Sequence, residues 1–407
     1  MHESANLRRG GRPDAERIGA VPQRPAVALQ RAKLVGEGGA SEESVSLALV
    51  ALGDGDGSAG ADTNMVVAGL LSDLAFIQDS KQRQFGYKQA ARAIRWLDEP
   101  VEALRLPDGS LRRVPRIGPA STRVILEVLA TGSSPTVETA VALSPRAGDV
   151  VRRRQWRAHF LSRARVRTVL ADPALDGPQW LDYRGDLQMH STWSDGSQSL
   201  EDIVGTGRAR GYAFAAVTDH SGGLPIANGL SPERFARQIA AIDALRPQVP
   251  AGFRLLKGVE ANIGADGQLD VEPDALLQFD VVLAAPHSKL RVADDQTARL
   301  LTVLRTRGVH ILGHPRGRIY GTRPGITADW GLVFAEAAAR GVAVEIDGDP
   351  SRQDLDYVLA QQAVAAGCLF ALDSDAHGVH EWSYAETAVA HARLAGVVLH
   401  AELVVLG

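Results

Sequence analysis

Nine polar side chains of the types that bind divalent metal ions recur along the second half of this 407-residue chain. They are Gln188, His190, Asp195, His220, Glu260, His287, His314, Asp375 and His377. Imidazole nitrogens suit Zn, Mn or Fe, and carboxylates supply negative charge and can bridge two ions. A site with several ions can produce hydroxide near neutral pH and stabilise both oxygens of a phosphoryl transfer. The residue types therefore indicate a metal-dependent phosphoesterase, with Glu260 as the best candidate for a bridging carboxylate.

Most of these residues directly follow short apolar segments that are rich in Val, Leu and Ala. Continuous apolar runs of this length are typical of strands that are covered on both faces. The expected strands span residues 212–218, 253–259, 281–285, 309–312, 342–346 and 368–372. Helical segments are expected between them, including residues 200–210, 232–246 and 298–307. This alternation predicts an α/β fold with a parallel sheet, in which the carboxyl ends of the strands bring the ligands to one face.

A simpler interpretation exists for any single member of the set, because a lone His at a strand end is usually a packed or hydrogen-bonded residue. Nine such polar groups at successive strand ends are hard to explain in this way, since each would need its own buried partner. The remaining six histidines have no such surroundings, and we expect them to be structural or solvated. They are His2, His159, His310, His380, His391 and His400.

The run Asp186-Leu-Gln-Met-His190-Ser-Thr-Trp-Ser194-Asp195-Gly196, with the ordered ligands that follow it, resembles the polymerase and histidinol phosphatase (PHP) superfamily. Within that superfamily it is most similar to the carboxyl-terminal PHP module of bacterial family X DNA polymerases, over about residues 183 to 396. The resemblance implies a distorted (β/α)7 barrel of the PHP type and three divalent metal ions (Mn²⁺, Zn²⁺ or Fe²⁺). Many PHP proteins have His at the position of Gln188, whereas Gln coordinates only through a neutral carbonyl.

Basic residues on the loops after two of the ligands are candidates for binding the substrate phosphate. They are Lys289, Arg316, Arg318 and Arg323. Arg can hold a phosphate with two parallel hydrogen bonds, whereas Lys acts as a point charge. The alternative is a set of solvated surface charges. Catalytic roles are expected for His190, Asp195, Glu260, Asp375 and Arg318.

The region before the barrel has helical periodicity on both sides of a tight Pro/Gly turn, Val114-Pro-Arg-Ile-Gly-Pro119. Residues 65–132 resemble the amino-terminal helix-hairpin-helix region of the same polymerases, which implies contacts with DNA phosphates that do not depend on sequence. The expected DNA-binding residues are Arg92, Arg95, Arg113, Ile117 and Gly118. Two departures are Arg116, where the hairpin usually has Gly, and Pro119, which lacks an N–H. The alternative is a small helical bundle that only packs on the barrel.

The resemblance also places a polymerase palm between these two regions, but here only residues 133–181 intervene. That arginine-rich stretch is shorter than a domain of the usual size, which is about 100 residues or more. We therefore expect a linker or helix there and no nucleotidyltransferase activity. Residues 1–64 are predicted to be a disordered lead-in, and residues 182–407 a PHP phosphoesterase domain.

The net charge, the cysteine content and the absence of long apolar segments indicate the cellular compartment in which the protein is expected. The formal net charge is −4, the only cysteine is Cys368, and no long apolar segment indicates a signal peptide or membrane span. These features predict a cytoplasmic protein with no membrane partner, and they leave its oligomeric state open. The predicted function is phosphoester hydrolysis at DNA ends in repair, as a 3′-5′ exonuclease, a 3′-phosphatase or an abasic-site enzyme. The alternative is a small-molecule phosphatase of the histidinol-phosphatase type.

Overall fold

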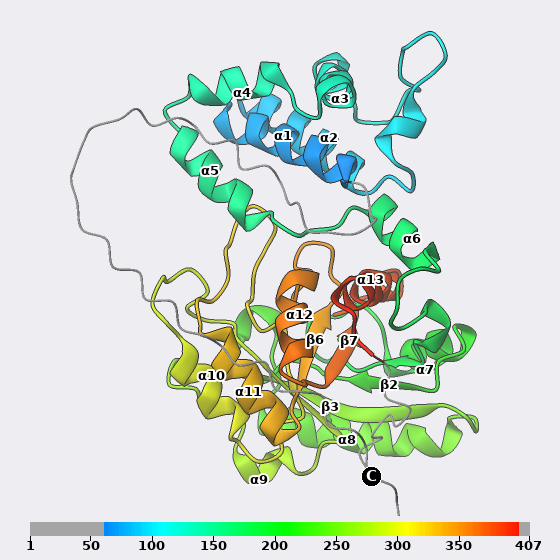
Figure 1. The fold of residues 1–407 in the computed structure, drawn as a ribbon. Helices are drawn as coiled ribbons and strands as arrows, with labels where there is room; N and C mark the ends of the chain where they lie inside the picture. Colours follow the sequence, from blue (N-terminus) through cyan, green and yellow to red (C-terminus); the bar gives the residue numbers. More distant parts are fainter. Residues whose placement is uncertain (1–60, 399–407) are drawn as a thin grey trace, which may run out of the picture. The chain divides into compact units, whose positions relative to one another are not determined.

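A computed structural model describes residues 61–398. Its second half is built on seven parallel strands that pair in the order of the sequence (Figure 1). They are β1 (Gly185–Asp186), β2 (Phe214–Val217), β3 (Arg254–Asn262), β4 (Val281–Ala285), β5 (Ile311–Leu312), β6 (Ala343–Asp347) and β7 (Phe370–Asp373). The sheet nearly closes beyond β1 and β7, where Met189 and Ala376 form a parallel bridge and His190 N donates to Ala376 O at 2.9 Å. This confirms the predicted (β/α)7 barrel.

The apolar segments became strands because both of their faces are covered. All five residues of β4 are buried, and the core around it holds Val259, Leu312 and Val344 from the neighbouring strands. The observed strands lie at or near the predicted segments, and β4 coincides with residues 281–285. β1 was not predicted, since two residues are too short to produce an apolar pattern.

Helices lie between the strands and cover the outside of the barrel, as α10, α11 and α12 do beside β6 in Figure 1. The barrel helices are α7 (Leu200–Ala209), α8 (Pro232–Leu245), α9 (Pro273–Leu276), α10 (Thr297–Leu304), α11 (Trp330–Arg340), α12 (Tyr357–Ala365) and α13 (Ala385–Ala395). Their starts follow local rules. Ser199 and Asp202 form a capping box at α7, and Ser231 caps α8 ahead of Pro232 at its first position.

The first half of the described chain forms a separate helical core. Its helices are α1 (Thr63–Ile77), α2 (Lys81–Arg95), α3 (Pro119–Thr131), α4 (Pro135–Ala142) and α5 (Ala147–Trp156). Val137, Val141 and Val150 pack in the same apolar cluster as Leu71 and Ile94. This helical region therefore continues beyond residue 132, where its end was predicted. The predicted disordered lead-in falls almost entirely on residues 1–60, outside the described part.

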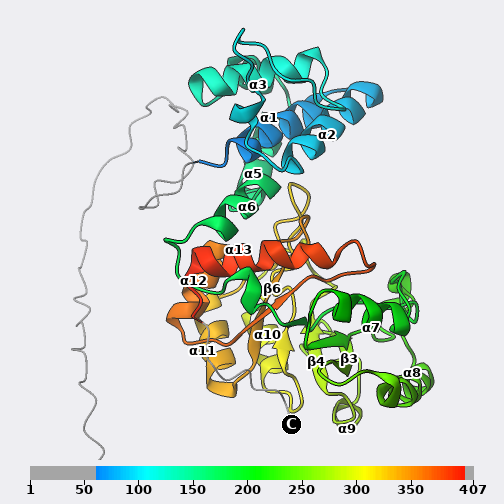
Figure 2. The ribbon, with the colours of Figure 1, turned by 90° about the vertical axis from the view of Figure 1, so that its right-hand side faces the viewer.

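α6 (Arg163–Ala171) packs against α13 of the barrel, and the two helices lie side by side in Figures 1 and 2. Val166 and Val169 of α6 pack on Ala390 of α13. The buried guanidinium of Arg393 donates to four carbonyl oxygens in residues 169–178. The arginine-rich segment thus supplies a packed helix. Between residues 61 and 398, no helix combines the length and the apolar character needed to cross a membrane.

Candidate metal centre

Glu260 lies at the centre of the predicted ligands, fully buried on β3. Its Oε2 lies 3.3 Å from His190 Nε2 and 3.1 Å from His220 Nδ1. Its Oε1 lies 3.1 Å from His287 Nε2 and 2.9 Å from His314 Nε2. Burial opposes ionisation of this carboxyl, but the surrounding imidazoles hold its pKa well below its usual range. A carboxylate with imidazoles at both oxygens has the arrangement of a bridging ligand.

The ligand atoms form three overlapping groups, and within each group they all lie within 4.8 Å of one another. The groups are His190, Asp195, His220 and His377; His220, Glu260 and His287; and His190, Glu260 and Asp375. Asp195 completes the first group, with Oδ1 3.7 Å from His220 Nε2 and 3.5 Å from His377 Nε2. Eight of the nine predicted ligands thus meet at one place, since His314 joins them through Glu260. Mixed nitrogen and oxygen donors of this kind suit Mn, Zn or Fe.

Several buried polar atoms at this centre have no hydrogen-bond partner among residues 61–398. They include His220 Nδ1, Glu260 Oε2, His287 Nε2 and Asp375 Oδ2. Buried polar atoms in proteins are nearly always paired, because an unpaired one costs free energy. Divalent cations would satisfy these atoms, so the residues fit a metal centre.

Gln188, the ninth ligand candidate, is fully buried at the same end of the barrel. In the orientation that satisfies its amide, the nitrogen donates to the carboxylate of Glu345 on β6. Its carbonyl oxygen is then the atom that remains for a metal ion. Glu345 also accepts a hydrogen bond from the backbone N–H of His314, so one buried acid orients two candidate ligands. Glu345 was not identified from the sequence, because it lies inside a predicted strand and not after its end.

Hydrogen bonds at the far side of two imidazoles orient them for metal binding. His377 Nδ1 lies 2.8 Å from the carbonyl oxygen of Asp375, so this nitrogen carries the proton and Nε2 is free. His287 Nδ1 lies 2.6 Å from Asn262 Oδ1, which has the same consequence. Asn262 is held in turn by Asp270, whose Oδ2 accepts from its Nδ2 at 2.8 Å. Such outer contacts set the tautomer and direction of a ligand.

The turn between His190 and Asp195 depends on a glycine and a buried acid. A side chain at Gly196 would place its Cβ 2.3 Å from the carbonyl oxygen of His190, so the turn can close only with glycine. Asp219 is fully buried and accepts from Ser191 N at 2.8 Å and from the hydroxyl groups of Ser191 and Ser194. It therefore holds the turn that carries two ligands.

Several known proteins are similar to this chain in sequence. The protein "DNA polymerase/3'-5' exonuclease PolX" of Bacillus subtilis (strain 168) is 38% identical over 211 residues, which are 52% of this chain and 37% of that protein. A "Probable phosphatase" of Syntrophotalea carbinolica is 30% identical over 40% of this chain and 64% of its own length. "Probable phosphatase YcdX" of Escherichia coli (strain K12) is 28% identical over 48% of this chain and 79% of its own length.

These relatives support a metal-dependent phosphoesterase of the PHP type that resembles PolX. The chain spans about a third to two thirds of the length of the first two relatives. No protein-family model matches it. A solved structure, histidinol phosphate phosphatase of Lactococcus lactis with Zn, L-histidinol and phosphate, is 18% identical and covers 53% of this chain and 94% of that one, with a TM-score of 0.40.

The basic residues predicted to bind phosphate at the PHP site have different surroundings. Lys289 is exposed, with no side-chain partner in the described part of the chain. Arg316 pairs with Asp356 at 2.8 Å. Arg318 is 2% exposed and donates to the carbonyl oxygens of Arg352, Gln353 and Ala158 and to Asp356. The Arg318 guanidinium, predicted to act on substrate, is thus occupied by these partners and holds the loop that carries Arg352 and Gln353.

Arg352 is the basic residue at the PHP site that sequence reasoning missed. Its Nε lies 3.4 Å from Asp375 Oδ2 and 3.7 Å from Asp347 Oδ2. Although burial opposes ionisation of Asp375, the charge of Arg352 holds the pKa of this ligand below its usual range. The available signal was the position of Arg352, a few residues after the acidic end of β6.

The predicted DNA-binding residues of the helical region divide into two sets. Arg113, Ile117 and Gly118 line an open groove of about 560 Å³ with an apolar floor. Arg116 has a φ of +69°, a conformation that favours glycine and agrees with the glycine expected there. Arg92 is exposed. Arg95 instead turns to the barrel: it donates to Pro350 O and lies 3.9 Å over the ring of Tyr320.

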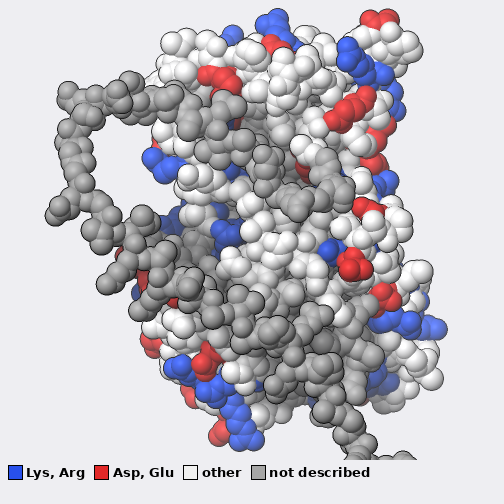
Figure 3. All heavy atoms as spheres, in the orientation of Figure 1, with Lys and Arg blue, Asp and Glu red and all other residues white. Residues whose placement is uncertain are grey.

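The arginine-rich segment carries less free positive charge than its composition indicates. Arg154 and Arg157 pair with Asp73, and Arg163 and Arg167 pair with Asp98. On the face that Figure 3 shows, basic and acidic side chains of the described residues are interspersed. Most of this positive charge therefore contributes to packing of the helical region.

Proposed function

We propose that this chain hydrolyses phosphate esters at DNA ends, as a 3′-5′ exonuclease, a 3′-phosphatase or an abasic-site enzyme in DNA repair. The observation that carries the proposal is the combination of two parts in one chain. A PHP ligand set surrounds Glu260, and an exposed basic hairpin, Arg113 to Arg123, edges an open groove. The similarity to the Bacillus PolX protein, whose name includes a 3′-5′ exonuclease, supports the same substrate class.

We further propose that the site holds three divalent ions, Mn²⁺, Zn²⁺ or Fe²⁺, one for each group of ligand atoms. Such ions stabilise negative charge on the phosphoryl oxygens and lower the pKa of an attacking water. The chain's own residues provide the arrangement. Glu260 holds neighbouring positions together, Asn262 fixes the direction of His287, and Asp219 fixes the turn that carries His190 and Asp195.

The arginine at the centre has a clear place in this chemistry. Arg352 lies beside Asp375, on the metal side of the loop after β6. A guanidinium there can hold a non-reacting oxygen of the substrate phosphate and stabilise the charge that grows on it. With ions held by these ligands, no separate protein base would be needed.

A small-molecule phosphatase of the histidinol-phosphatase type is the second candidate function. It is favoured by the relatives named as probable phosphatases, one of which this chain covers over 79% of its length. In that case the helical region would serve assembly or packing, as the contact of Arg95 with the barrel allows.

A substrate comparison tests the choice. The Mn²⁺-loaded full chain would be given a 3′-recessed duplex, a duplex with a 3′-phosphate, and histidinol phosphate, with the Glu260→Ala and His190→Ala variants as controls. Hydrolysis of DNA by the wild type and its loss in both variants would support the proposal. Turnover of histidinol phosphate alone would overturn the DNA proposal and favour the second candidate.

A further inference from the structure

The guanidinium of Arg352 is placed beside the metal centre with its hydrogen-bonding capacity unused. Its Nε lies 3.4 to 4.0 Å from carboxylate oxygens of Asp375, Asp347 and Asp349, longer than a hydrogen bond allows for two of them. Within residues 61–398, no side-chain hydrogen bond of Arg352 meets the geometric criteria for one. The side chain is 21% exposed, so one side of the planar fork remains open to an incoming anion.

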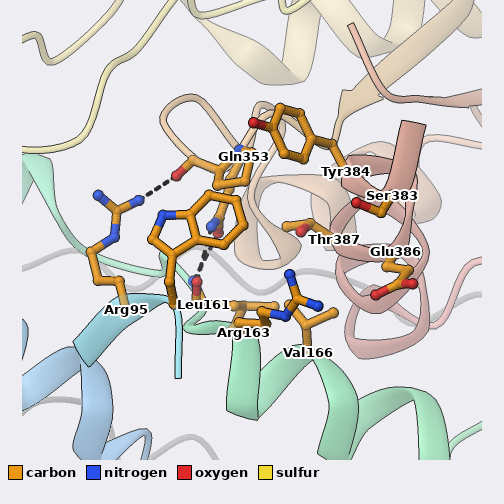
Figure 4. Close-up of a pocket in the computed structure, with 11 residues that line it drawn as sticks. Arg95, Leu161, Arg163, Val166, Gln353, Ser383, Tyr384, Glu386 and Thr387 are labelled. Carbon is orange, nitrogen blue, oxygen red and sulfur yellow. Dashed lines mark hydrogen bonds between the residues drawn. The ribbon is translucent and has the colours of Figure 1, made fainter. Parts of the chain in front are cut away.

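The loop that carries Arg352 is held on both sides. Arg318 donates to the carbonyl oxygens of Arg352 and Gln353 at 3.0 and 2.9 Å. Gln353 forms two hydrogen bonds with the backbone of Leu161, at 2.7 and 3.0 Å (Figure 4). These hydrogen bonds lie beside a small cavity of about 30 Å³. Arg95 and Tyr384 also line this cavity, as Figure 4 shows. The backbone position of Arg352 is therefore fixed before substrate arrives.

A second arginine lies next to the first. Arg323 Nε donates to Gly317 O, and Gly317 N donates to Asp354 Oδ2 at 2.7 Å, two residues beyond Arg352. No acid lies within 4.0 Å of the Arg323 guanidinium in the part of the chain that is described. Burial and then the charges of Arg352 and Arg291 lower the pKa of Arg323 to about 10. Two like charges thus act on Arg323, and the charge of Asp354 offsets them in part.

A third arginine, Arg291, lies on the side of Arg323 that faces solvent. It is exposed on the loop after His287, and its Nη1 donates at 2.8 Å to the carbonyl oxygen of Thr322, the neighbour of Arg323. Arg352 lies at the metal centre, Arg323 is half-buried and Arg291 is exposed, and hydrogen bonds through Thr322, Gly317 and Asp354 connect the segments that carry these three residues. Like charges in a row repel unless an anion lies along them. A single phosphate monoester needs only the innermost group.

We propose that Arg352, Arg323 and Arg291 bind successive phosphates of one DNA strand whose terminal phosphate lies at the metal centre. The proposal rests on the proposed DNA function and narrows its substrate class to a strand with several phosphates. Arg352 contacts the reacting phosphate. Arg323 and Arg291 contact phosphates further along the strand and so act on binding and not on the chemical step.

We call Arg352, Arg323 and Arg291 together the phosphate track. Four variants of the full chain test it: Arg352→Gln, Arg323→Gln, Arg291→Gln and, as a matched control, Arg307→Gln. Arg307 is exposed just before β5, at the opposite end of the strands from the metal ligands. Each Mn²⁺-loaded protein would be given single-stranded oligothymidylate and bis(p-nitrophenyl) phosphate, which has only one phosphate. Binding of the oligonucleotide would be measured separately by fluorescence anisotropy in chelator, over a range of salt concentrations.

We expect Arg352→Gln to lower kcat/KM for both substrates. Arg323→Gln and Arg291→Gln should each raise KM for the oligonucleotide about 3- to 10-fold, and each should reduce the slope of log affinity against log salt by about 0.7. Their turnover of the small diester should match that of Arg307→Gln. Metal content and melting temperature should equal those of the wild type in all four variants, and Arg352→Lys should recover part of the activity.

The outcomes separate the two proposals. If the wild type hydrolyses the diester but neither binds nor cleaves the oligonucleotide, and also leaves the 3′-recessed and 3′-phosphate duplexes intact, the DNA function itself fails. If the wild type cleaves the oligonucleotide while Arg323→Gln and Arg291→Gln behave like Arg307→Gln, the DNA function stands and the track is overturned. Loss of bound metal in Arg352→Gln would assign that residue a structural role among the carboxylates and remove it from the track.

Discussion

The metal centre and the basic hairpin of the helical region are built in opposite ways. Ligands of the centre come from the ends of six strands and lie up to 189 residues apart, between Gln188 and His377, and most of them are buried. The hairpin residues Arg113, Ile117 and Gly118 are neighbours in sequence and line an open groove. Buried, coupled charges have few alternative partners, whereas exposed ones interact mainly with water. Substitutions should therefore have large effects in the barrel and small ones in the hairpin.

The largest effect is expected for Glu260→Gln. Both oxygens of Glu260 face imidazoles, and an amide cannot supply the negative charge that holds two neighbouring ions. Hydrolysis of any phosphate ester should fall on the order of 10³-fold, and metal analysis should find fewer ions per chain. A variant with normal metal content and activity would contradict the bridging role.

Substitutions in the helical region are expected to have small effects, with one exception. The exception is Asp73, whose carboxylate is buried. Arg157 Nη2 lies 2.5 Å and Arg154 Nε 2.7 Å from its oxygens. Asp73→Ala leaves the buried charge of Arg157 without a partner, so the helical region should lose about 3 kcal/mol of stability. Urea unfolding would measure this, with the exposed Asp79→Ala as control. Equal stability of the two variants would show that the pair contributes little.

Acid should weaken the barrel through His391, a buried residue of α13 that accepts a hydrogen bond from Tyr357 N at 3.0 Å. Burial lowers the pKa of His391 to about 3. The unfolded chain therefore takes up a proton below a pH of about 6.5 and the folded chain does not, so stability falls as the pH falls. Between about pH 7 and pH 5 the loss should be about 2 kcal/mol. In His391→Gln, the free energy of unfolding measured with urea should fall less between pH 7 and pH 5. An equal fall in the variant and the wild type would refute this role of His391.

The smallest effect is expected for Arg113→Gln in the hairpin. This exposed guanidinium should contribute one phosphate contact, so DNA affinity should fall about 3-fold, with a smaller salt dependence. Hydrolysis of a small diester should not change, because the residue lies outside the metal centre. Arg112→Gln is the matched control, since Arg112 already pairs with Glu99. If Arg113→Gln impaired diester hydrolysis, the separation of the two regions would be wrong.

The apolar runs of the sequence predicted the parallel sheet and the positions that bear its ligands, and the resemblance to PHP proteins implied the barrel. Apolar runs with polar residues at their ends have few interpretations, because a parallel sheet covered on both faces requires such runs. The predicted segment 281–285 became β4 without a shift, and eight predicted ligands meet around Glu260. The metal count, the DNA contacts and the catalytic roles remain predictions.

Only the tertiary structure decided which basic residues face the metal centre. Arg318 and Arg352 look alike in the sequence, yet Arg318 is buried against carbonyl oxygens while Arg352 stands beside Asp375. Arg95 likewise lies in a basic helix but turns to Tyr320 of the barrel. A ligand at a strand end is positioned by its own strand, so a local pattern reveals it. The environment of a long side chain on a loop depends on segments far away in the sequence, and no local pattern contains that information.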